Sequence, residues 1–320
     1  MDFITFQNTC LKREVIEVPN QVPANPMVSI LVQTYQHEHY IKECIKGILA
    51  QKTNFTYEIL IGEDNSRDKT REICLAISKK HPDKVRLFLH HRENQKKILE
   101  EPTANFNAFY NFFSARGKYY AFCEGDDLWA DPEKLQRQID FLILNPEYVL
   151  TYHNFVTITS NGDPVESIEA ATQPTSDLSQ KELTEGIFHP LLLTVCFKKD
   201  FTELPSEMFE VINIDTFLLS FLGNYGKGKY LNDIQPSKYR KHQGGIWSAR
   251  IKEKKILSKI ITYYQLQNYY WKNNNMKLYT LYKQRHLNHY KMLLLKYIRR
   301  GNWRYIFPLI LKYLKERKVT

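Results

Sequence analysis

From residue 27 to residue 145, short apolar runs rich in β-branched residues alternate with longer segments that have helical spacing. The apolar runs lie at 27–35, 57–64, 85–91 and 118–127. Continuous runs of this kind are typical of strands buried on both faces, and their alternation with helices is typical of a parallel sheet. The pattern therefore predicts an α/β fold with a mostly parallel central sheet flanked by helices.

The intervening helices are predicted from apolar residues three and four positions apart. The first begins near Ile41, the second runs through Ile73 and Ile77, and the third occupies about 105–115. A further helix is predicted at 131–145, because Pro132 suits a first turn and apolar residues line one face.

The remaining chain is less regular. Strands are predicted at 148–159 and 188–199, a polar loop at 161–185, a short helix at 212–223, and a strand followed by a loop across 227–247. Helical spacing returns beyond residue 250. Three regions are thus expected: an irregular, proline-containing lead-in at 1–26, an α/β domain at 27–250 and a helical, basic, Tyr-rich extension at 251–320.

Charge is divided unevenly between these regions. Residues 251–320 contain 17 Lys and Arg residues against two acids, whereas residues 1–250 contain 28 basic and 33 acidic side chains. The net charge of +10 therefore combines a mildly acidic body with a strongly basic tail. Such asymmetry suggests that the tail meets a polyanion, such as a membrane surface or a nucleic acid.

Cysteine usage and hydrophobicity bear on location. The five cysteines show no CxxC spacing, so neither a zinc site nor a disulfide framework is indicated. The N-terminus lacks the long apolar core of a signal peptide, and no apolar stretch reaches the ~18 residues that a spanning helix needs. We expect a cytoplasmic protein that lies on the membrane surface if it meets a membrane.

Three carboxylates close the fourth predicted strand: Glu124, Asp126 and Asp127. Carboxylates so close together repel one another unless a cation lies among them, and Mg²⁺ is usually held by one or two carboxylates plus substrate phosphates. Ligands of parallel sheets bind outside the carboxyl ends of the strands. The cluster is a candidate metal site; the alternative is a solvated acidic turn or a cap for the next helix.

Polar residues also close the first two predicted strands: Gln33, Thr34 and Tyr35 after the first, and Glu63, Asp64 and Ser66 after the second. A carboxylate such as Asp64 could accept hydrogen bonds from a nucleobase or ribose, and the ring of Tyr35 could stack on a base. The alternatives are that Ser66 or Asp68 caps the next helix and that Tyr35 belongs to the packing.

Two candidates lie further along the chain. Asp215 stands among apolar residues near the start of a predicted helix, where a carboxylate facing a cleft could be a general base. The alternative for Asp215 is a helix N-cap. Arg240 and His242, on a basic loop, could contact phosphates or a metal.

Taken in order, these segments resemble the family 2 glycosyltransferases, inverting enzymes with the GT-A nucleotide-sugar-binding fold. The resemblance covers roughly residues 27–247. It is strongest at the acidic motif, with its trailing Trp, Pro, Lys-Leu and Gln. The segments that carry it are VSILVQTYQHEHYIKECIKGILAQ, ILIGEDNSRDKT, KYYAFCEGDDLWADPEKLQRQIDFL and INIDTFLLSFLGNYGKGKYLNDIQPSKYRKHQGG.

The resemblance implies transfer of a sugar from a nucleotide-diphosphate donor, with a UDP-sugar favoured, to a hydroxyl of a glycan or lipid-linked acceptor in surface polysaccharide biosynthesis. It implies a divalent metal (Mn²⁺ or Mg²⁺) and Asp215 as the general base. The implied metal ligands are Asp126, Asp127 and Glu124. The implied nucleotide-binding residues are Gln33, Thr34, Tyr35, Glu63, Asp64, Ser66 and Asn105. Candidates for binding the diphosphate or the metal are Arg240 and His242.

The chain departs from the family pattern at several of these positions. Gln33 and Gln36 stand where Pro and Asn are usual, and Glu124 stands where Asp is common. Asn213 stands where a second acid often accompanies the base. Asp126 and Asp127 therefore keep closest to the metal-binding pattern.

Other classes of protein explain fewer of the features. A metal-dependent nucleotidyltransferase normally has a Gly-rich, basic phosphate loop after the first strand, where this chain has QTYQHEHY. A nucleic-acid-binding protein that grips its ligand with the basic tail leaves the acidic strand ends unexplained. A catalytically inactive, sugar-binding relative is distinguished only by an assay. We expect no nucleic-acid partner.

The tail at 251–320 contains ten of the 21 tyrosines and many basic residues, and its apolar residues include Leu293–Leu295 and Trp303. Basic amphipathic helices with aromatic anchors bind anionic membrane surfaces. The tail is therefore expected to hold the protein peripherally at the inner face of the cytoplasmic membrane. The alternative is a helical cap on the α/β domain whose basic face is merely solvated.

Overall fold

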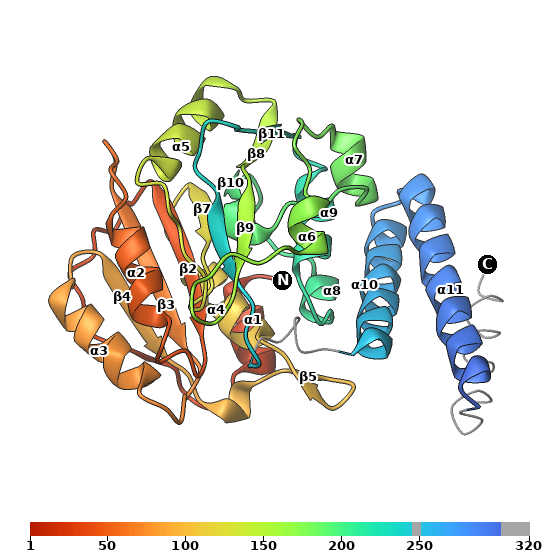
Figure 1. Ribbon diagram of the computed structural model, residues 1–320, viewed down its shortest axis with the longest axis horizontal. Helices are drawn as coiled ribbons and strands as arrows, with labels where there is room; N and C mark the ends of the chain where they lie inside the picture. The colour runs from red at the N-terminus through yellow and green to blue at the C-terminus, as the bar shows by residue number, and fades with distance from the viewer. Residues whose placement is uncertain (245–250, 302–320) are drawn as a thin grey trace. The chain divides into compact units, whose positions relative to one another are not determined.

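In the computed structural model, residues 1–244 and 251–301 are described, and the chain forms two compact units (Figure 1). The first unit, residues 1–204 and 218–244, is built around an eight-stranded sheet. The second unit comprises residues 205–217 and the chain from 245 onward, and its described part is helical.

The central sheet is mostly parallel. Its strands lie in the order β1 (Ile16–Glu17), β4 (Val85–Leu89), β3 (Tyr57–Glu63), β2 (Val28–Thr34), β7 (Tyr119–Phe122), β10 (Cys196–Lys198), β8 (Tyr148–Tyr152) and β11 (Lys227–Tyr230). Only β1 and β10 run antiparallel to their neighbours. β2 and β3 are buried at every position, as expected for strands covered on both faces. The predicted α/β fold is confirmed.

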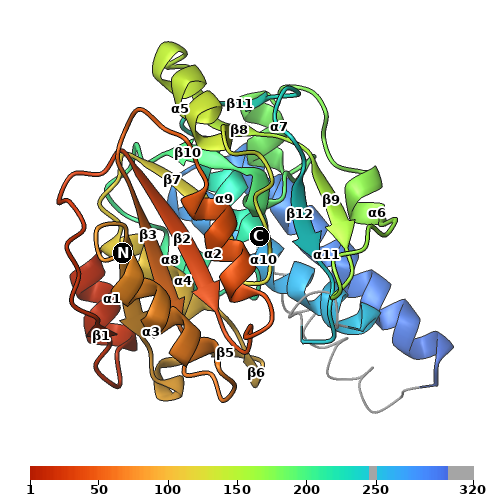
Figure 2. The same cartoon turned by 60° about the vertical axis from the view of Figure 1, so that its left-hand side comes forward.

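Helices cover both faces of this sheet (Figures 1 and 2). On one face, α2 (Ile41–Leu49), α3 (Thr70–Lys80) and α5 (Lys134–Leu144) pack an aliphatic core against the parallel strands. On the other face lies α4 (Asn105–Ser114), on which α1 (Phe3–Cys10) packs through aromatic rings. The central strands are therefore shielded from water above and below.

The order of the strands reverses once among the parallel strands. From β2 the chain passes through α2 to β3 and through α3 to β4, and then returns through α4 to β7 on the opposite side of β2. Because such crossovers are right-handed, the reversal places α4 on the face opposite to α2 and α3. Ligands of open α/β sheets bind where the strand order reverses, outside the carboxyl ends of the strands. The fold therefore points to the segments that follow β2 and β7.

Smaller elements complete the first unit. β12 (Ser237–Arg240) pairs in parallel with β9 (Phe155–Ile158), beside which it lies in Figure 2. β5 (Lys97–Ile98) and β6 (Glu101–Pro102) form a short antiparallel pair. The short helices are η1 (Arg92–Asn94), α6 (Ile168–Ala171), α7 (Gln180–Glu185) and η2 (Leu192–Thr194).

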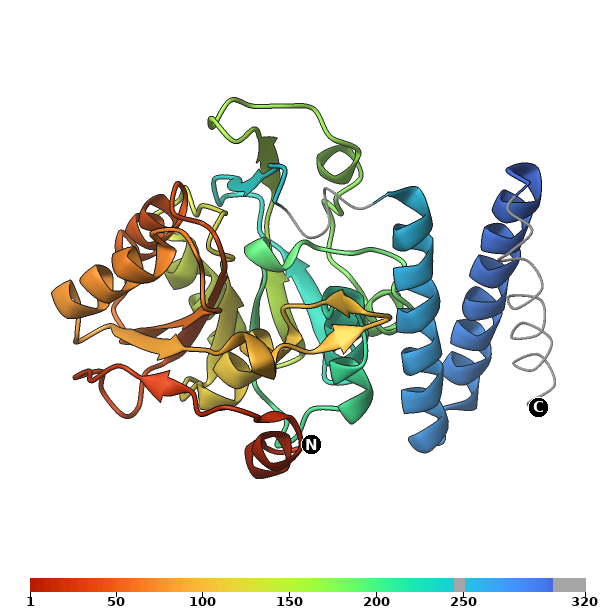
Figure 3. The ribbon, with the colours of Figure 1, turned by 90° about the horizontal axis from the view of Figure 1, so that it is seen from below.

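The second unit is built on two long helices. α10 (Lys252–Lys272) and α11 (Met276–Arg299) lie side by side and are joined by a tight turn (Figure 3). Ile260, Tyr290 and Leu293 are buried between them. α8 (Ser206–Phe209) and the start of α9 (Asp215–Leu222) belong to the same unit. No helix in the described residues is long and apolar enough to cross a membrane.

Several predicted boundaries were wrong. The lead-in is not wholly irregular, because α1 and β1 lie within it. The run at 148–159 divides into β8 and β9, the polar segment 161–185 contains α6 and α7, and only Cys196–Lys198 of the run 188–199 is strand. Residues 302–320, which include Trp303, lie outside the described residues.

The predicted start of the fourth helix was also wrong. The helix α5 begins at Lys134, and Pro132 lies in a turn before it. The carboxylate of Asp131 accepts the N–H of Glu133 at 2.8 Å, and its carbonyl accepts Nε2 of Gln51 at 2.6 Å. These hydrogen bonds stabilise residues 131–133 as a turn that precedes the helix. The Gln51 side chain also accepts the N–H of Leu135, at 3.0 Å, so it supports the first turn of α5.

Candidate active site

The segments that follow β2 and β7 pack directly against each other. The acidic loop, residues 123–128, donates the N–H of Gly125 to the carbonyl of Gln33 at 2.9 Å. A Cβ at Gly125 would lie 2.7 Å from Oγ1 of Thr34 and 2.9 Å from Nδ1 of His37. No side chain fits there without displacing the turn. The glycine of the acidic motif therefore lets the loop rest on the polar turn after β2.

β12 brings a third segment to the acidic loop. The backbones of Leu128 and Lys238 exchange hydrogen bonds of 3.1 and 2.8 Å. Two residues further along β12, the N–H of Arg240 donates to Oδ1 of Asp127 at 2.8 Å. Because these hydrogen bonds hold β12 against the acidic loop, the residues that follow β12 also lie beside this loop.

Arg240 is a buried brace for this arrangement. Its Nε donates to the carbonyl of Asp126 at 3.0 Å, and one terminal nitrogen donates to Oε2 of Glu43 at 2.7 Å. The other terminal nitrogen donates to the carbonyls of Thr159 and Ser160, at 3.3 and 3.2 Å. The guanidinium thus ties the acidic loop to α2 and to the end of β9.

Three side chains converge beside this brace: His37, Asp126 and His242. Nε2 of His242 lies 2.9 Å from Oδ2 of Asp126, and Nε2 of His37 lies 3.8 Å from the same oxygen. One potential ligand atom from each residue lies within 4.8 Å of the other two. The three side chains are only 10% to 14% exposed, so the cluster lies just beneath the surface.

Hydrogen bonds fix the orientation of His37. Its backbone N–H donates to Oγ1 of Thr70 at 2.8 Å, and its Nδ1 lies 3.3 Å from Oγ1 of Thr34. The contact with Thr34 leaves Nε2 directed at Asp126, the arrangement in which a histidine commonly ligates a metal. Burial lowers the pKa of His37 despite the nearby charge of Asp126. The ring is therefore neutral near pH 7, as a metal ligand must be.

The cluster contains the donors of a divalent-metal site. Oδ1 of Asp126 is buried and has no hydrogen-bond partner among the residues that the structure describes. An unpaired buried carboxylate oxygen is rare in proteins and is accounted for when a cation binds it. A carboxylate with two imidazoles suits Mn²⁺ better than Mg²⁺, because Mg²⁺ prefers oxygen ligands. His37, Asp126 and His242 therefore fit a divalent metal.

The other two predicted metal ligands are placed differently. Asp127 is buried and braced by Arg240, and burial, together with the charges of Asp126 and Glu124, raises its pKa. Glu124 is exposed, and its carbonyl accepts a hydrogen bond from Sγ of Cys44 at 3.3 Å. Neither carboxylate belongs to the converging group found in the described part of the chain. Metal ligation by Asp127 and Glu124 stays a prediction.

A second cluster joins the ends of β2 and β3 to η1. The guanidinium carbon of Arg92 lies 4.1 Å from the centre of the Tyr35 ring, and a terminal nitrogen of Arg92 donates to Oδ2 of Asp64 at 2.5 Å. Burial raises the pKa of Asp64 to about 6, although Arg92 acts in the opposite direction. A ring, a carboxylate and a guanidinium in contact can stack on a nucleobase and accept from its N–H groups.

The remaining nucleotide-binding candidates make contacts within the protein. Glu63 is fully buried, where it pairs with Arg71 and accepts the N–H of Ser66 at 2.6 Å. Oγ of Ser66 accepts a backbone N–H from the turn after β2 at 3.0 Å. Gln33 is buried in β2, and Asn105 is buried in the first turn of α4. The structure brings Thr34, Tyr35, Asp64 and Ser66 to the same edge of the sheet.

Asp215 belongs to the second unit, where it opens α9. Its side chain is partly exposed, although Val211, Ile212 and Phe217 around it are buried. An acid in the first turn stabilises a helix through the partial positive charge at its N-terminus. The position is thus compatible with a structural role and with a carboxylate open to a ligand.

Comparison with known proteins identifies the family to which the chain belongs. A family model described as glycosyl transferase family 2 matches residues 29–191. The chain belongs to the family 2 glycosyltransferases. An uncharacterized protein of Mycobacterium tuberculosis is 31% identical over 226 residues, which cover 69% of this chain and 61% of the relative. An uncharacterized glycosyltransferase of Nostoc is 29% identical over 146 residues, 46% of this chain and 41% of that protein. The chain thus spans less than two thirds of the length of these curated relatives.

Solved structures show the same GT-A fold. Residues 1–349 of TarS from S. aureus, in complex with UDP-GlcNAc, superpose with a TM-score of 0.51 at 15% identity, covering 90% of this chain and 91% of that one. The mannosyltransferase PcManGT from Pyrobaculum calidifontis, in complex with GDP-Man and Mn²⁺, gives a TM-score of 0.50 at 13% identity, covering 98% and 90%. At this level of identity the likeness establishes the fold alone.

Proposed function

We propose that this protein is a metal-dependent, inverting glycosyltransferase that moves a sugar from a UDP-sugar to a hydroxyl of a glycan or lipid-linked acceptor in surface polysaccharide biosynthesis. The observation that carries the proposal is the convergence of His37, Asp126 and His242 at the point where the strand order reverses. Two proteins that share the fold were solved with nucleotide sugars, TarS with UDP-GlcNAc and PcManGT with GDP-Man, and this supports a nucleotide-sugar donor. The UDP-sugar is the donor that the sequence resemblance implies.

The residues of the chain divide the work as follows. When bound by His37, Asp126 and His242, a divalent ion supplies Lewis-acid stabilisation of the negative charge that develops on the departing diphosphate. Tyr35 stacks on the base and Asp64 accepts from its N–H, and Arg92, which contacts both side chains, holds them next to each other.

The transfer itself is a single displacement. The acceptor oxygen forms a bond to the anomeric carbon as the bond from that carbon to the diphosphate oxygen breaks, so the configuration inverts. Asp215 takes the proton that the acceptor hydroxyl loses, and the nucleoside diphosphate leaves with the bonding electrons. A general base of this kind contributes about 10²–10⁴-fold to the rate.

A donor screen tests the nucleotide and the metal together. We expect UDP and UDP-sugars to raise the melting temperature of the full-length protein in the presence of Mn²⁺, and to raise it much less in excess EDTA, because a ligand that binds only the folded state stabilises it. Asp64→Ala should reduce the shift, whereas exposed Asp140→Ala on α5 should not. Equal stabilisation by ADP and UDP, or full transfer activity in EDTA, would contradict the proposal.

We also propose that the tail attaches the protein to an anionic membrane surface. Met292, Leu295 and Ile298 recur every three residues on α11 and are 42% to 53% exposed. Basic residues, including Lys291 and Arg299, are exposed beside them. An apolar stripe bordered by cations is the arrangement of a helix that lies in a lipid interface.

Acidic substitutions on this stripe should release the protein from membranes. The double variant Leu295→Glu/Ile298→Glu is expected to bind phosphatidylserine-containing liposomes about tenfold more weakly or worse, because each charge near such a surface changes the binding free energy by about 1 kcal/mol. Flotation measures the bound fraction. Leu144→Glu, at a 78% exposed position on α5, is the matched control. If the double variant floated with liposomes as the wild type does, the stripe would not be the membrane-binding surface.

A further inference from the structure

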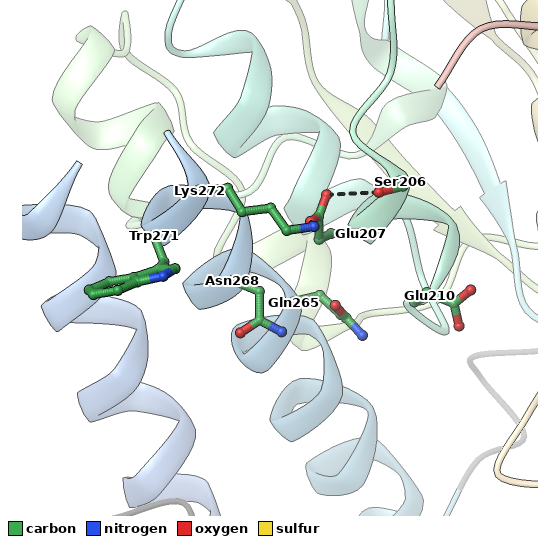
Figure 4. A pocket seen from close by; sticks show the side chains of 7 residues that line it. All are labelled: Ser206, Glu207, Glu210, Gln265, Asn268, Trp271 and Lys272. Carbon is green, nitrogen blue, oxygen red and sulfur yellow. Dashed lines mark hydrogen bonds and ion pairs between the residues drawn. The ribbon is translucent and has the colours of Figure 1, made fainter. Parts of the chain in front are cut away.

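The second unit contains a pocket of about 400 Å³ between α8 and α10 (Figure 4). Gln265, Asn268 and Lys272 recur at spacings of three and four along α10 and therefore share one face of the helix, and Trp271, three residues after Asn268, lies at the edge of that face. The opposite wall comes from α8 and the residue that follows it. The wall residues that matter here are Glu207 and Glu210 on the α8 side, and Gln265, Asn268, Trp271 and Lys272 on α10.

Two amide side chains in this wall are unused by the protein. The side-chain amides of Gln265 and Asn268 make no hydrogen bond, ion pair or ring contact with any residue that the structure describes. Figure 4 shows both amides on the side of α10 that faces the pocket. Each amide offers two N–H donors and one carbonyl acceptor. Such groups can bind a ligand that both donates and accepts hydrogen bonds.

Trp271 adds an apolar surface to the polar wall. Its side chain is 55% exposed, and its ring packs at a tilt against Tyr279, with the ring centres 5.1 Å apart. Indole rings combine a large flat apolar face with a polar N–H, and an exposed one is available for a ligand. A pyranose ring matches this combination, because its C–H bonds form an apolar face while its hydroxyls project from the rim.

The carboxylates of the pocket suit a ligand that carries hydroxyl groups. Glu207 is buried, where it accepts Oγ of Ser206 at 3.3 Å and pairs with Lys272, whereas Glu210 is exposed. The ion pair with Lys272 compensates the charge of Glu207. Carboxylates accept hydrogen bonds from the hydroxyls that an uncharged sugar presents.

We infer that this pocket is a binding subsite for an uncharged oligosaccharide, which holds the glycan part of the acceptor away from the reacting hydroxyl. The inference rests on the proposed function, because it assigns the acceptor of that reaction. A further observation links the two: Asp215, the proposed base, and the α8 wall of the pocket lie in the same segment of the same unit, residues 205–217. The acceptor must meet both.

Oligosaccharide binding by the full-length protein tests the inference. The protein, without donor or metal, is titrated separately with maltotetraose, chitotetraose, mannotetraose and galactotetraose, and binding is followed by saturation-transfer NMR and calorimetry. We expect at least one of them to bind. Trp271→Ala and the double variant Gln265→Ala/Asn268→Ala should each weaken that binding about tenfold or more, since stacking residues and buried polar contacts dominate small interfaces. Trp271→Phe, which keeps a ring, should retain most of it.

The controls separate this inference from the function on which it rests. Lys259→Ala, an exposed change on α10 away from the pocket, should bind like the wild type. Stabilisation by UDP and Mn²⁺, measured on the same samples, should be the same in all variants. Failure of all four sugars to bind, or equal binding by the pocket variants, overturns the subsite while UDP binding persists. Loss of UDP binding in the wild type instead overturns the proposed function.

Discussion

Replacing Asp126 with alanine should abolish metal-dependent sugar transfer while the protein stays folded. Asp126 supplies the only carboxylate in the His37–Asp126–His242 cluster, and its Oδ1 has no hydrogen-bond partner within the described chain. Without it, two neutral imidazoles have to hold a divalent cation. Loss of charge stabilisation on a leaving diphosphate costs several kcal/mol, which corresponds to a rate decrease of about 10³-fold or more.

Direct metal binding separates this effect from a general loss of activity. Mn²⁺ binding, measured by electron paramagnetic resonance or calorimetry, should be lost in Asp126→Ala and weakened in His37→Ala and His242→Ala. The wild type should bind Mn²⁺ more tightly than Mg²⁺, because two of the three donors are nitrogens. Asp140→Ala, at an exposed position, is the matched control. If Asp126→Ala bound Mn²⁺ as tightly as the wild type, the cluster would not be the metal site.

The parallel sheet was predictable because its strands have a recognisable sequence pattern. β2 and β3 are buried on both faces, so they consist of continuous apolar residues that cannot be mistaken for surface segments. The helix α1 was missed because its eight residues have no strong amphipathic pattern, and its packing depends on aromatic rings of α4, about 100 residues away. Pro132 misled the prediction of α5, because Asp131 and Gln51 hold the preceding residues in a separate turn.

The candidate site was predictable where a strand end coincides with a motif. Asp126 lies at such an end, and the position of His242 shortly after β12 brings it to the same place. His37 and Arg92 were missed. Both follow strands of the parallel sheet, β2 and β4, so the strand-end rule applied to every strand selects their segments. That Thr34 and Thr70 orient His37 depends on tertiary contacts that no local pattern reveals.

For Arg240, the sequence indicated the position near the site but not the role of the side chain. A basic residue beside a histidine in a loop was a reasonable phosphate ligand from sequence, yet its guanidinium is engaged by Glu43 and by backbone carbonyls. The same residue type therefore acts as a brace here. Sequence places such a residue near the site, whereas the number of its donors already used decides what it can bind.

Changing Asp215 to asparagine should remove sugar transfer and leave donor and metal binding intact. Asparagine has nearly the same size and also suits the start of a helix, so α9 should form and the melting temperature should change little. An amide cannot take a proton from the acceptor hydroxyl, however. The expected loss in kcat is about 10²–10⁴-fold, with little change in the affinity for UDP or Mn²⁺.

The same variant distinguishes catalysis from helix stabilisation. An acid in the first turn of a helix contributes about 0.3–1 kcal/mol to the stability of the folded state through the helix macrodipole. If Asp215 had only this role, its replacement would lower the fraction of folded protein but would not change the transfer rate of each folded molecule. Initial rates at matched folded concentration, with UDP release as the readout, therefore separate the two roles. Asp163→Asn, in an exposed turn, is the control for loss of a surface charge. Near-normal transfer by Asp215→Asn would show that this carboxylate stabilises the helix and is not the general base.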